Sequence, residues 1–268
     1  MEFICKNCHT ENDEAFVYCP KCSQKVHLHR LTFHDILHEA MHYFTHVDKG
    51  IFQLIRDLIL KRGIVAREYI DGKRKKYFPP LNFFLLIATV FVFMSTLGET
   101  KENISLEKKY PNLKEITNPH DKAFAIGIYE RKENVTHFTA KYSNLMAMCS
   151  LPLSAFIFWL FYRKGKYNYI EHLIAGMYML GICILIYALI ILPISYLFHF
   201  PYYYAVVIFF VVQLVYFSTF YYGFLSKTTK LAFLKALGVS VVSFMTWTII
   251  SGSVIRMYIS NGFWGLLH

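Results

Sequence analysis

Residues 31–80 read LTFHDILHEAMHYFTHVDKGIFQLIRDLILKRGIVAREYIDGKRKKYFPP, and this stretch decides how the rest of the chain is organised. It joins a cysteine-rich N-terminal segment, residues 1–30, to a C-terminal part, residues 81–268, in which long apolar runs dominate. In its first part a histidine recurs at every fourth position, at His34, His38, His42 and His46. Four consecutive basic residues, 73–76, stand just before the apolar sequence.

The composition indicates a membrane protein. Hydrophobic residues make up 55% of the 268 residues, aromatic residues 18% and charged residues 17%, and the mean hydropathy is +0.35. Soluble domains carry about 25% charged residues. The formal charge of +10 fits the same interpretation, because lysine and arginine collect on the cytoplasmic side of membrane spans. Basic residues are also what contacts to nucleic-acid phosphates require, but the cysteine-rich head has no base-reading element, and we expect no nucleic-acid partner.

Five stretches are long and apolar enough to cross a bilayer, which takes about 20 residues. They are residues 81–97, 144–162, 171–197, 203–225 and 231–255. The third contains Pro193, which predicts a kink or a tilt. The predicted fold is therefore an α-helical polytopic membrane protein of about five transmembrane helices, with a small N-terminal head and amphipathic helices at the membrane surface.

The charges that flank the spans predict an orientation. Basic residues within 73–76, 163–166 and 227–230 all fall on the side of the head, and an excess of positive charge marks the cytoplasmic side. We expect a bacterial inner membrane protein with a cytoplasmic N-terminus and an external C-terminus. The start MEFICKNC lacks the basic and apolar regions of a signal peptide, which also favours a cytosolic head. An external loop, residues 98–143, is expected to carry a short helix around residues 121–131.

The head contains the pattern C-x2-C-x10-C-x2-C, formed by Cys5, Cys8, Cys19 and Cys22. Each close pair makes a tight turn that points two sulfurs at one ion, and tetrahedral zinc takes four such ligands. Thiols stay reduced in the cytosol, which favours a metal over disulfides. We predict a structural Zn²⁺ that folds residues 1–30 as a zinc ribbon, with residues 16–18 as a strand. An iron site or a metal-free redox pair is the alternative.

The histidines lie on a predicted amphipathic helix. Thr32 followed by Asp35 resembles a capping box at its start. At 100° per residue, Phe33 and Ile36 share an apolar face, and the four histidines occupy the opposite sector. A second helix is expected after Asp48. Its apolar stripe consists of Ile51, Leu54, Ile55 and Leu58, and Gly63 is expected to end it.

Within the first helix, His38-Glu39-Ala-Met-His42 matches the pattern H-E-x-x-H. In zinc hydrolases of this type the two histidines, one turn apart, bind the metal and the glutamate activates its water. Four histidines on one helix cannot converge on one ion, because His34 and His46 lie about 18 Å apart along the axis. One pair would need a ligand from elsewhere. The alternative is a polar face of neutral histidines.

Glu171 and His172 are the leading candidates for that missing ligand. They open the third span on the predicted cytoplasmic side, where the histidine helix should lie as well. Together with His38 and His42 they would hold a second divalent metal. The spans themselves contain almost no ionisable residues, and Gln213 is the notable polar group apart from hydroxyls. This composition argues against an ion-coupled transporter.

The basic turn follows an Asp71-Gly72 turn signal. Basic residues just outside a span gain about 1 kcal/mol each from anionic lipid headgroups. They serve either as an orientation anchor or as a specific site for a phosphate or a lipid headgroup. The residues of such a site would be Arg67, Lys73, Arg74, Lys75 and Lys76.

These features together resemble an uncharacterised bacterial family of polytopic membrane proteins with an N-terminal zinc ribbon, annotated only as a domain of unknown function. The resemblance covers residues 1–90 and rests on the cysteine head and two later runs. The runs are His46-Val-Asp48-Lys49-Gly50 and Arg67-Glu-Tyr-Ile-Asp-Gly72-Lys73-Arg74, followed by Tyr77 and Pro80. The family's glycine after each C-x2-C is replaced here by His9 and Ser23. Family members often place a histidine six residues after a Glu-His pair, where this chain has Tyr178.

The resemblance implies the architecture and leaves the activity open. Our first hypothesis is a non-enzymatic membrane protein whose head and surface helices contact anionic lipid headgroups of the bilayer or a cytosolic partner protein. The competing hypothesis is a membrane metalloenzyme with zinc at His38 and His42 and with Glu39 as the catalytic base.

Overall fold

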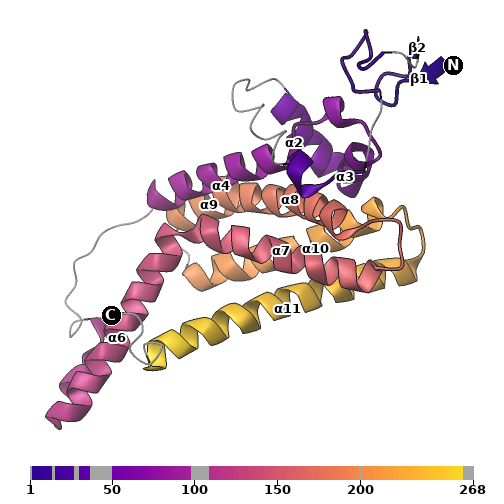
Figure 1. Cartoon of the computed structure of the whole chain (residues 1–268). Coiled ribbons are helices and arrows are strands. Elements are labelled where there is room, and N and C mark those ends of the chain that lie inside the picture. The colour runs from indigo at the N-terminus through magenta and orange to yellow at the C-terminus, as the bar shows by residue number, and fades with distance from the viewer. Residues whose placement is uncertain are drawn as a thin grey trace.

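The computed structural model describes residues 2–13, 16–26, 30–36, 50–97, 109–198 and 201–261. These residues form a small head with two short strands, a helical platform beside it and a bundle of long helices (Figure 1). Five helices of the described part are long and apolar enough to cross a membrane, as the sequence predicts. The chain is thus a mostly helical protein with the features of a multi-pass membrane protein.

The head consists of two hydrogen-bonded turns beside a two-stranded antiparallel sheet, β1 (Glu2–Ile4) and β2 (Glu11–Asp13). The predicted strand at residues 16–18 is wrong. In that region only the isolated bridge between Tyr18 and Lys25 is formed, and the side chains of residues 16–18 are exposed. These residues have a strand-like composition, but the described part of the head offers no second sheet for them to join.

Two helices and a turn form what we call the platform: α2 (Gly50–Lys61), α3 (Gly63–Ile70) and the 3₁₀ turn η1 (Arg74–Lys76). The predicted stripe on α2 is confirmed, because Ile51, Leu54 and Leu58 are buried and Ile55 packs against the same core. The expected role of Gly63 is wrong. Arg62, and not Gly63, is the residue with a positive φ, of 50°, after α2. Gly63 is the first residue of α3.

Gly63 is required by close packing rather than by its own backbone conformation. A Cβ at this position would lie 1.9 Å from the carbonyl oxygen of Phe220, on helix α10 (Tyr202–Phe224). The backbones of α3 and α10 therefore meet directly. Tyr216 adds a second link by donating a hydrogen bond of 2.8 Å to the carbonyl of Leu58. The platform is thus fixed to the bundle.

The bundle is built around α8 (Tyr169–Ile186), of which nearly every residue is buried. Helices α4 (Pro80–Leu97), α7 (Ser143–Tyr162), α10 and α11 (Lys230–Asn261) complete it. Small residues bring α8 close to its neighbours: a Cβ at Gly181 would lie 2.6 Å from Phe83 on α4, and one at Gly176 would lie 2.9 Å from Leu151 on α7. The predicted third span is the centre of the fold.

Pro193 changes the form of that span. A π-helical turn, η3 (Tyr187–Ile191), separates α8 from α9 (Leu192–Leu197). Proline has no N–H to donate to the preceding turn, and a π-turn is one way in which a helix accommodates this loss. The structure thus has a π-turn just before Pro193, and the predicted kink or tilt stays a prediction.

The helix expected around residues 121–131 is much longer than predicted. It is α6 (Pro119–Lys141), a helix of 23 residues capped by the side chain of Asn118 and preceded by the 3₁₀ turn η2 (Pro111–Lys114). Its apolar residues do not gather on one face, so apolar periodicity does not indicate how long the helix is. Figure 1 shows α6 extending from the end of the bundle opposite the head.

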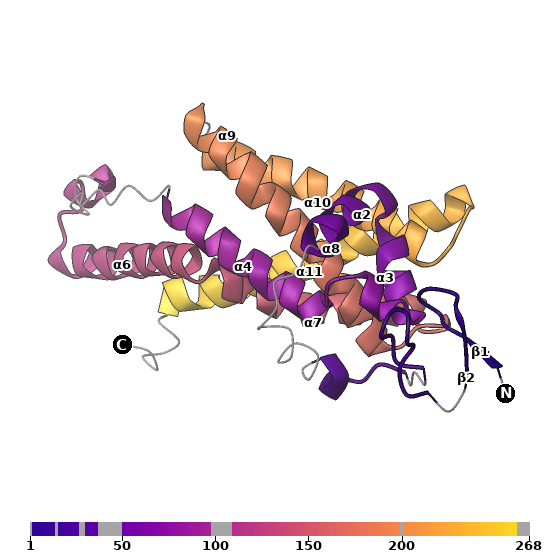
Figure 2. The same cartoon turned by 90° about the horizontal axis from the view of Figure 1, so that it is seen from above.

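The basic clusters gather at one end of the bundle, which we call the basic end. Both views place the head, the platform, the α7–α8 turn and the α10–α11 turn there (Figures 1 and 2). The last turns of α11 lie at the other end, where the carbonyl of Ile259 accepts a hydrogen bond of 2.8 Å from Arg131 on α6. The structure therefore places the three basic clusters that the prediction used at the same end of the bundle.

Candidate metal centre and the basic end

The four cysteines of the head converge on one point. Their sulfur atoms all lie within 4.8 Å of one another, with Cys5 Sγ 3.6 Å from Cys22 Sγ and Cys8 Sγ 3.6 Å from Cys19 Sγ. Four sulfurs placed tetrahedrally about 2.3 Å from a zinc ion would lie about 3.8 Å apart. The cluster therefore has the size of a four-thiolate metal site, and it could hold a metal ion.

The two turns that carry the cysteines have the same backbone conformation and the same hydrogen-bond pattern. The N–H of His9 donates to the carbonyl of Cys5 at 2.9 Å, and the N–H of Ser23 donates to the carbonyl of Cys19 at 2.8 Å. His9 and Ser23 are both left-handed, with φ of 59° and 57°. This conformation costs a residue with a side chain about 1–2 kcal/mol. These are the positions where the resemblance implies glycine. Glycine has no Cβ and adopts a positive φ without this cost.

The environment of the sulfurs distinguishes the cysteines from one another. Burial raises the pKa of Cys5 to about 11. Hydrogen bonding by the side chain and backbone of Thr10 lowers the pKa of Cys8 to about 6. The thiolate is the metal-binding form of cysteine. Cys8 therefore loses its proton more readily than Cys5.

The head is held against the platform and the bundle by polar contacts. The buried Gln24, next to Ser23, accepts a hydrogen bond of 3.1 Å from the backbone N–H of Lys75 in η1. A cleft of about 440 Å³ lies between the head and α3; its walls include Cys5 and His9 on one side and Glu68 and Asp71 on the other. The cysteine cluster therefore borders a cleft that faces the platform.

Arg30, which follows the head, joins it to the start of α8. Its guanidinium donates to Glu171 at 2.9 and 2.7 Å and to the carbonyl of Lys166 at 2.9 Å. Lys166 in turn donates to Asp71 at 2.6 Å, and this carboxylate raises the pKa of Lys166. One ionic network thus connects the head, the platform and the α7–α8 turn.

Glu171 also caps its own helix. Its carboxylate accepts from the N–H of Asn168 at 2.7 Å, and the side chain of Asn168 accepts from the N–H of Glu171 at 2.9 Å. This is a complete capping box. The sequence carries this signal as Asn-x-x-Glu, although the capping box was not predicted. The carboxylate therefore has structural partners on both sides.

His172 is fully buried between α8 and α10. Its Nδ1 lies 3.1 Å from the hydroxyl of Tyr221, and its Nε2 has no hydrogen-bond partner among the described residues. Tyr178 stands where the family often has histidine and donates to the carbonyl of Phe78 at 2.7 Å. Its hydroxyl thus joins α8 to the start of α4.

The prediction of a second metal site stays a prediction. His38, Glu39 and His42 lie outside the described residues. Of the histidine helix the structure describes residues 33–36. Its start is as predicted, because Thr32 and Asp35 exchange hydrogen bonds of 2.8 and 3.3 Å.

The residues of the basic turn are tied to the platform. Glu68 accepts hydrogen bonds from Lys73 at 2.9 Å and from Lys76 and Tyr77 at 2.6 Å each. Burial alone would raise the pKa of Glu68, but the bonds from Lys76, Tyr77 and Lys73 lower it to about 2. Arg67 donates to Ser226 and, at 3.2 Å, to the carbonyl of Gly223. These contacts give the basic turn a structural role.

A second basic surface lies at the same end, between α7, α10 and α11. It surrounds a pocket of about 380 Å³, which we call the basic pocket. Its exposed basic residues are Arg163, Lys164, Lys227 and Lys235. Lys235 donates to the carbonyl of Phe161 at 3.2 Å and lies 4.7 Å from the ring centre of Tyr162. Arg163, Lys164 and Lys227 belong to the clusters that predict the orientation, whereas Lys235 was not predicted because it lies inside α11.

Comparison with known proteins adds one match. Residues 48–92 match a family model described as "Protein of unknown function (DUF3667)". The matched segment runs from the residues before α2 into α4, so it spans the platform and most of the first membrane-spanning helix. No curated protein and no solved structure matches the chain. The match fits an uncharacterised family, in agreement with the resemblance.

Proposed function

We propose that this chain is a non-enzymatic membrane protein that binds anionic lipid headgroups at its basic end, beside a zinc-bound head. The basic pocket is the observation that supports this proposal. Its four basic side chains are exposed at the end of the bundle, whereas Lys73 and Lys76 of the basic turn are already paired with Glu68. Exposed lysine and arginine near a membrane surface attract anionic headgroups.

The chemistry of the pocket fits a phosphate group. Arg163, Lys164 and Lys227 offer charged donors at its rim, and the buried hydroxyl of Tyr162 has no partner among the described residues. Its wall also includes apolar side chains such as Leu160 and Leu225. A phosphate at the rim with an acyl chain along the apolar wall would use both properties.

The head has a structural role in this proposal. Zinc bound by Cys5, Cys8, Cys19 and Cys22 would complete a closed shell, and such sites stabilise small folds rather than catalyse. The docked head would then hold the platform in place through Gln24 and Arg30.

The proposed orientation puts the basic end in the cytosol of a bacterium and the C-terminus outside the inner membrane. A cytosolic protein that binds the head is the other form of this proposal.

Lipid titration tests the headgroup proposal. The full chain in detergent is titrated with dihexanoyl phosphatidylglycerol, dihexanoyl phosphatidylcholine or inorganic phosphate, and the melting temperature is recorded, because a ligand of the folded state stabilises it. We expect a saturable rise with phosphatidylglycerol, weakened by added salt. Stabilisation by inorganic phosphate alone would identify a soluble phosphate ligand instead.

Variants locate the site. The double variant Lys227→Gln/Lys235→Gln should lose most of the response to phosphatidylglycerol. The matched control Lys114→Gln/Lys122→Gln, which removes two lysines at the opposite end, should keep it. Equal responses of the two variants, or equal stabilisation by phosphatidylcholine, would refute the proposal.

A fluorescent protein that matures only in the cytosol, fused to either terminus, tests the orientation: we expect fluorescence from the N-terminal fusion alone.

No observation favours the metalloenzyme with zinc at His38 and His42 and with Glu39 as base. The carboxylate of Glu171 is already bound by Arg30 and by the N–H of Asn168. These bonds give the carboxylate a structural role that needs no metal. We therefore keep this function as an alternative hypothesis that the metal measurements in the Discussion test.

A further inference from the structure

A cavity of about 350 Å³ lies inside the membrane-spanning bundle, and the proposed headgroup site does not use it. All five membrane-spanning segments contribute to its wall, with Phe91 from α4, Ser150 from α7, Tyr187 from η3, Phe209 from α10 and Phe244 from α11. Its volume lies within the range of about 300–1,000 Å³ that is usual for small-molecule sites. The cavity also adjoins the π-turn η3, and π-turns occur often at functional sites.

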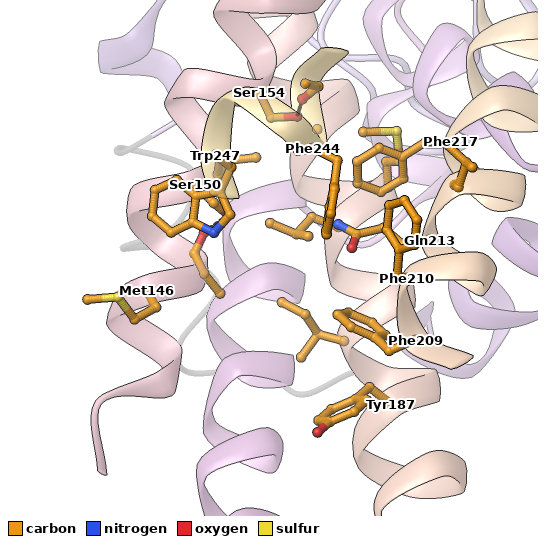
Figure 3. A pocket seen from close by; sticks show the side chains of 18 of the residues that line it. Met146, Ser150, Ser154, Tyr187, Phe209, Phe210, Gln213, Phe217, Phe244 and Trp247 are labelled. Carbon is orange, nitrogen blue, oxygen red and sulfur yellow. Dashed lines mark hydrogen bonds between the residues drawn. The ribbon is translucent and has the colours of Figure 1, made fainter. Parts of the chain in front are cut away.

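Most of the polar groups in this cavity already have partners in the protein. The hydroxyls of Ser154 and Ser243 bond to each other at 2.9 Å, and Ser150 and Ser240 each donate to a carbonyl of their own helix at 2.8 Å. Figure 3 shows the amide of Gln213 pointing into the cavity among the rings of phenylalanines, with Trp247 on the other side.

Gln213 and Trp247 therefore offer the polar groups that a ligand could use. Neither side chain has a hydrogen-bond partner within the part of the chain that the structure describes. An amide without a partner in a membrane interior costs free energy, because no water is there to bind it. A ligand that brings a donor and an acceptor to this point would remove that cost.

The depth of Gln213 restricts the charge of such a ligand. Gln213 is in the middle of α10, about 17 Å from either end of the helix at a rise of about 1.5 Å per residue. No charged side chain is among the described residues that line the cavity. A phosphate or an ammonium group would be costly at this depth without a counter-charge. The ligand must therefore have an uncharged polar group.

We propose that this cavity binds the headgroup of a neutral glycerolipid of the diacylglycerol class, with Gln213 as its hydrogen-bonding anchor. The lipid hydroxyl would pair with the Gln213 amide, and an ester carbonyl would accept from Gln213 or from the indole N–H of Trp247. The aromatic wall would cover the glycerol unit. The cavity is not fully enclosed, so the acyl chains would leave it through its opening.

Quenching of tryptophan fluorescence tests this site directly. The chain has three tryptophans, and Trp159→Phe/Trp264→Phe leaves Trp247 as the only tryptophan. The full chain is placed in nanodiscs of phosphatidylcholine, and diacylglycerol brominated on its acyl chains is added in increasing mole fraction. We expect the quenching of Trp247 to saturate at a low mole fraction. Brominated phosphatidylcholine at equal mole fraction should quench less and without saturation.

The variant Gln213→Leu separates anchoring from simple partitioning. It removes the amide but nearly keeps the volume, and it should raise the half-saturating mole fraction about five- to tenfold, as expected for one lost hydrogen bond. Its melting temperature without lipid should not fall, because the amide has no partner to lose. Thr219→Val on the same helix, whose hydroxyl bonds to its own helix at 3.0 Å, should leave quenching unchanged. Non-saturable quenching by diacylglycerol, or an unchanged half-saturation in Gln213→Leu, would overturn the proposal.

Discussion

Arg30 and Glu171 lie 141 residues apart in the chain and are joined by two hydrogen bonds of 2.9 and 2.7 Å. The two partners differ in their exposure: 56% of the Arg30 side chain is accessible to solvent, but only 7% of the Glu171 side chain. Arg30 thus pairs with a buried carboxylate at the start of α8, whose other partner is the N–H of Asn168. This pair is the link between the end of the head and the central helix of the bundle.

Replacing Arg30 by alanine should therefore destabilise the protein. We expect a loss of about 1–3 kcal/mol, the usual cost of leaving a buried polar group without its partner. The melting temperature in detergent measures the loss, and limited proteolysis should show faster cleavage between the head and the platform. Lys25→Ala removes another exposed basic side chain of the head and should change neither quantity. Equal behaviour of the two variants would mean that the pair does not hold the head.

Glu68 should make the stability of the platform depend on pH. Its pKa is lowered from 4.5 to about 2 in the folded chain. A group with a depressed pKa stabilises the fold above its unfolded pKa, and this stabilisation is lost as the pH falls through the folded pKa. The loss should occur between about pH 4.5 and pH 2 and amount to at most about 3 kcal/mol, since one pKa unit corresponds to about 1.4 kcal/mol. Melting temperatures across this pH range measure it.

The variant Glu68→Gln provides the comparison, because acid also protonates the cysteines and other carboxylates. It should be less stable than the original chain at neutral pH, and the difference between the two should shrink as the pH falls below about 4.5. A constant difference over this range would show that the contacts with Lys73, Lys76 and Tyr77 do not depend on the charge of Glu68.

Glycine at the two left-handed positions of the head should strengthen metal binding. His9 and Ser23 have φ values of 59° and 57°, and glycine adopts this conformation without the cost that a Cβ brings. His9→Gly and Ser23→Gly should each stabilise the metal-bound head by about 0.5–1 kcal/mol. Competition with a zinc chelator measures the effect as a higher chelator concentration at half release. Lys21→Gly, in the same turn but without a positive φ, should weaken binding instead.

Metal content should distinguish the two proposed sites. We expect one zinc ion per purified chain, because four cysteines form a closed shell. Cys5→Ser should abolish this zinc, and His38→Ala/His42→Ala should leave it unchanged. Elemental analysis of the purified variants checks both expectations. A second zinc that disappears only in the histidine double variant would revive the metalloenzyme hypothesis.

The sequence predicts the parts of this fold that depend on composition and local pattern. The five spans follow from apolar length, the paired cysteines from their spacing, and the α2 stripe from helical periodicity. The full length of helix α6 could not be predicted in this way, because its apolar residues do not gather on one face. Its Asn118-Pro119 start is a capping signal, which indicates where a helix begins but not how far it runs.

The long-range contacts of the site could not be predicted from the sequence. Nothing in the residues around Arg30 indicates that it pairs with Glu171, since local pattern says nothing about a partner 141 positions away. The same holds for Lys235, which belongs to the basic pocket only because α11 packs beside α7. The cavity around Gln213 likewise forms only when all the spanning segments are assembled.

Gly63 gives the most severe test of how the platform meets the bundle. A Cβ there would lie 1.9 Å from the carbonyl oxygen of Phe220 and 2.5 Å from the backbone nitrogen of Phe224, and rigid backbone atoms cannot move aside as a side chain can. Gly63→Ala should therefore separate α3 from α10 and cost about 3 kcal/mol or more, as overpacking at a rigid contact does. The melting temperature in detergent measures this loss. Gly238→Ala in α11, where a Cβ would meet nothing within 4 Å, should be neutral or stabilising by up to about 1 kcal/mol. If Gly63→Ala melts like Gly238→Ala, then α3 and α10 do not meet backbone to backbone.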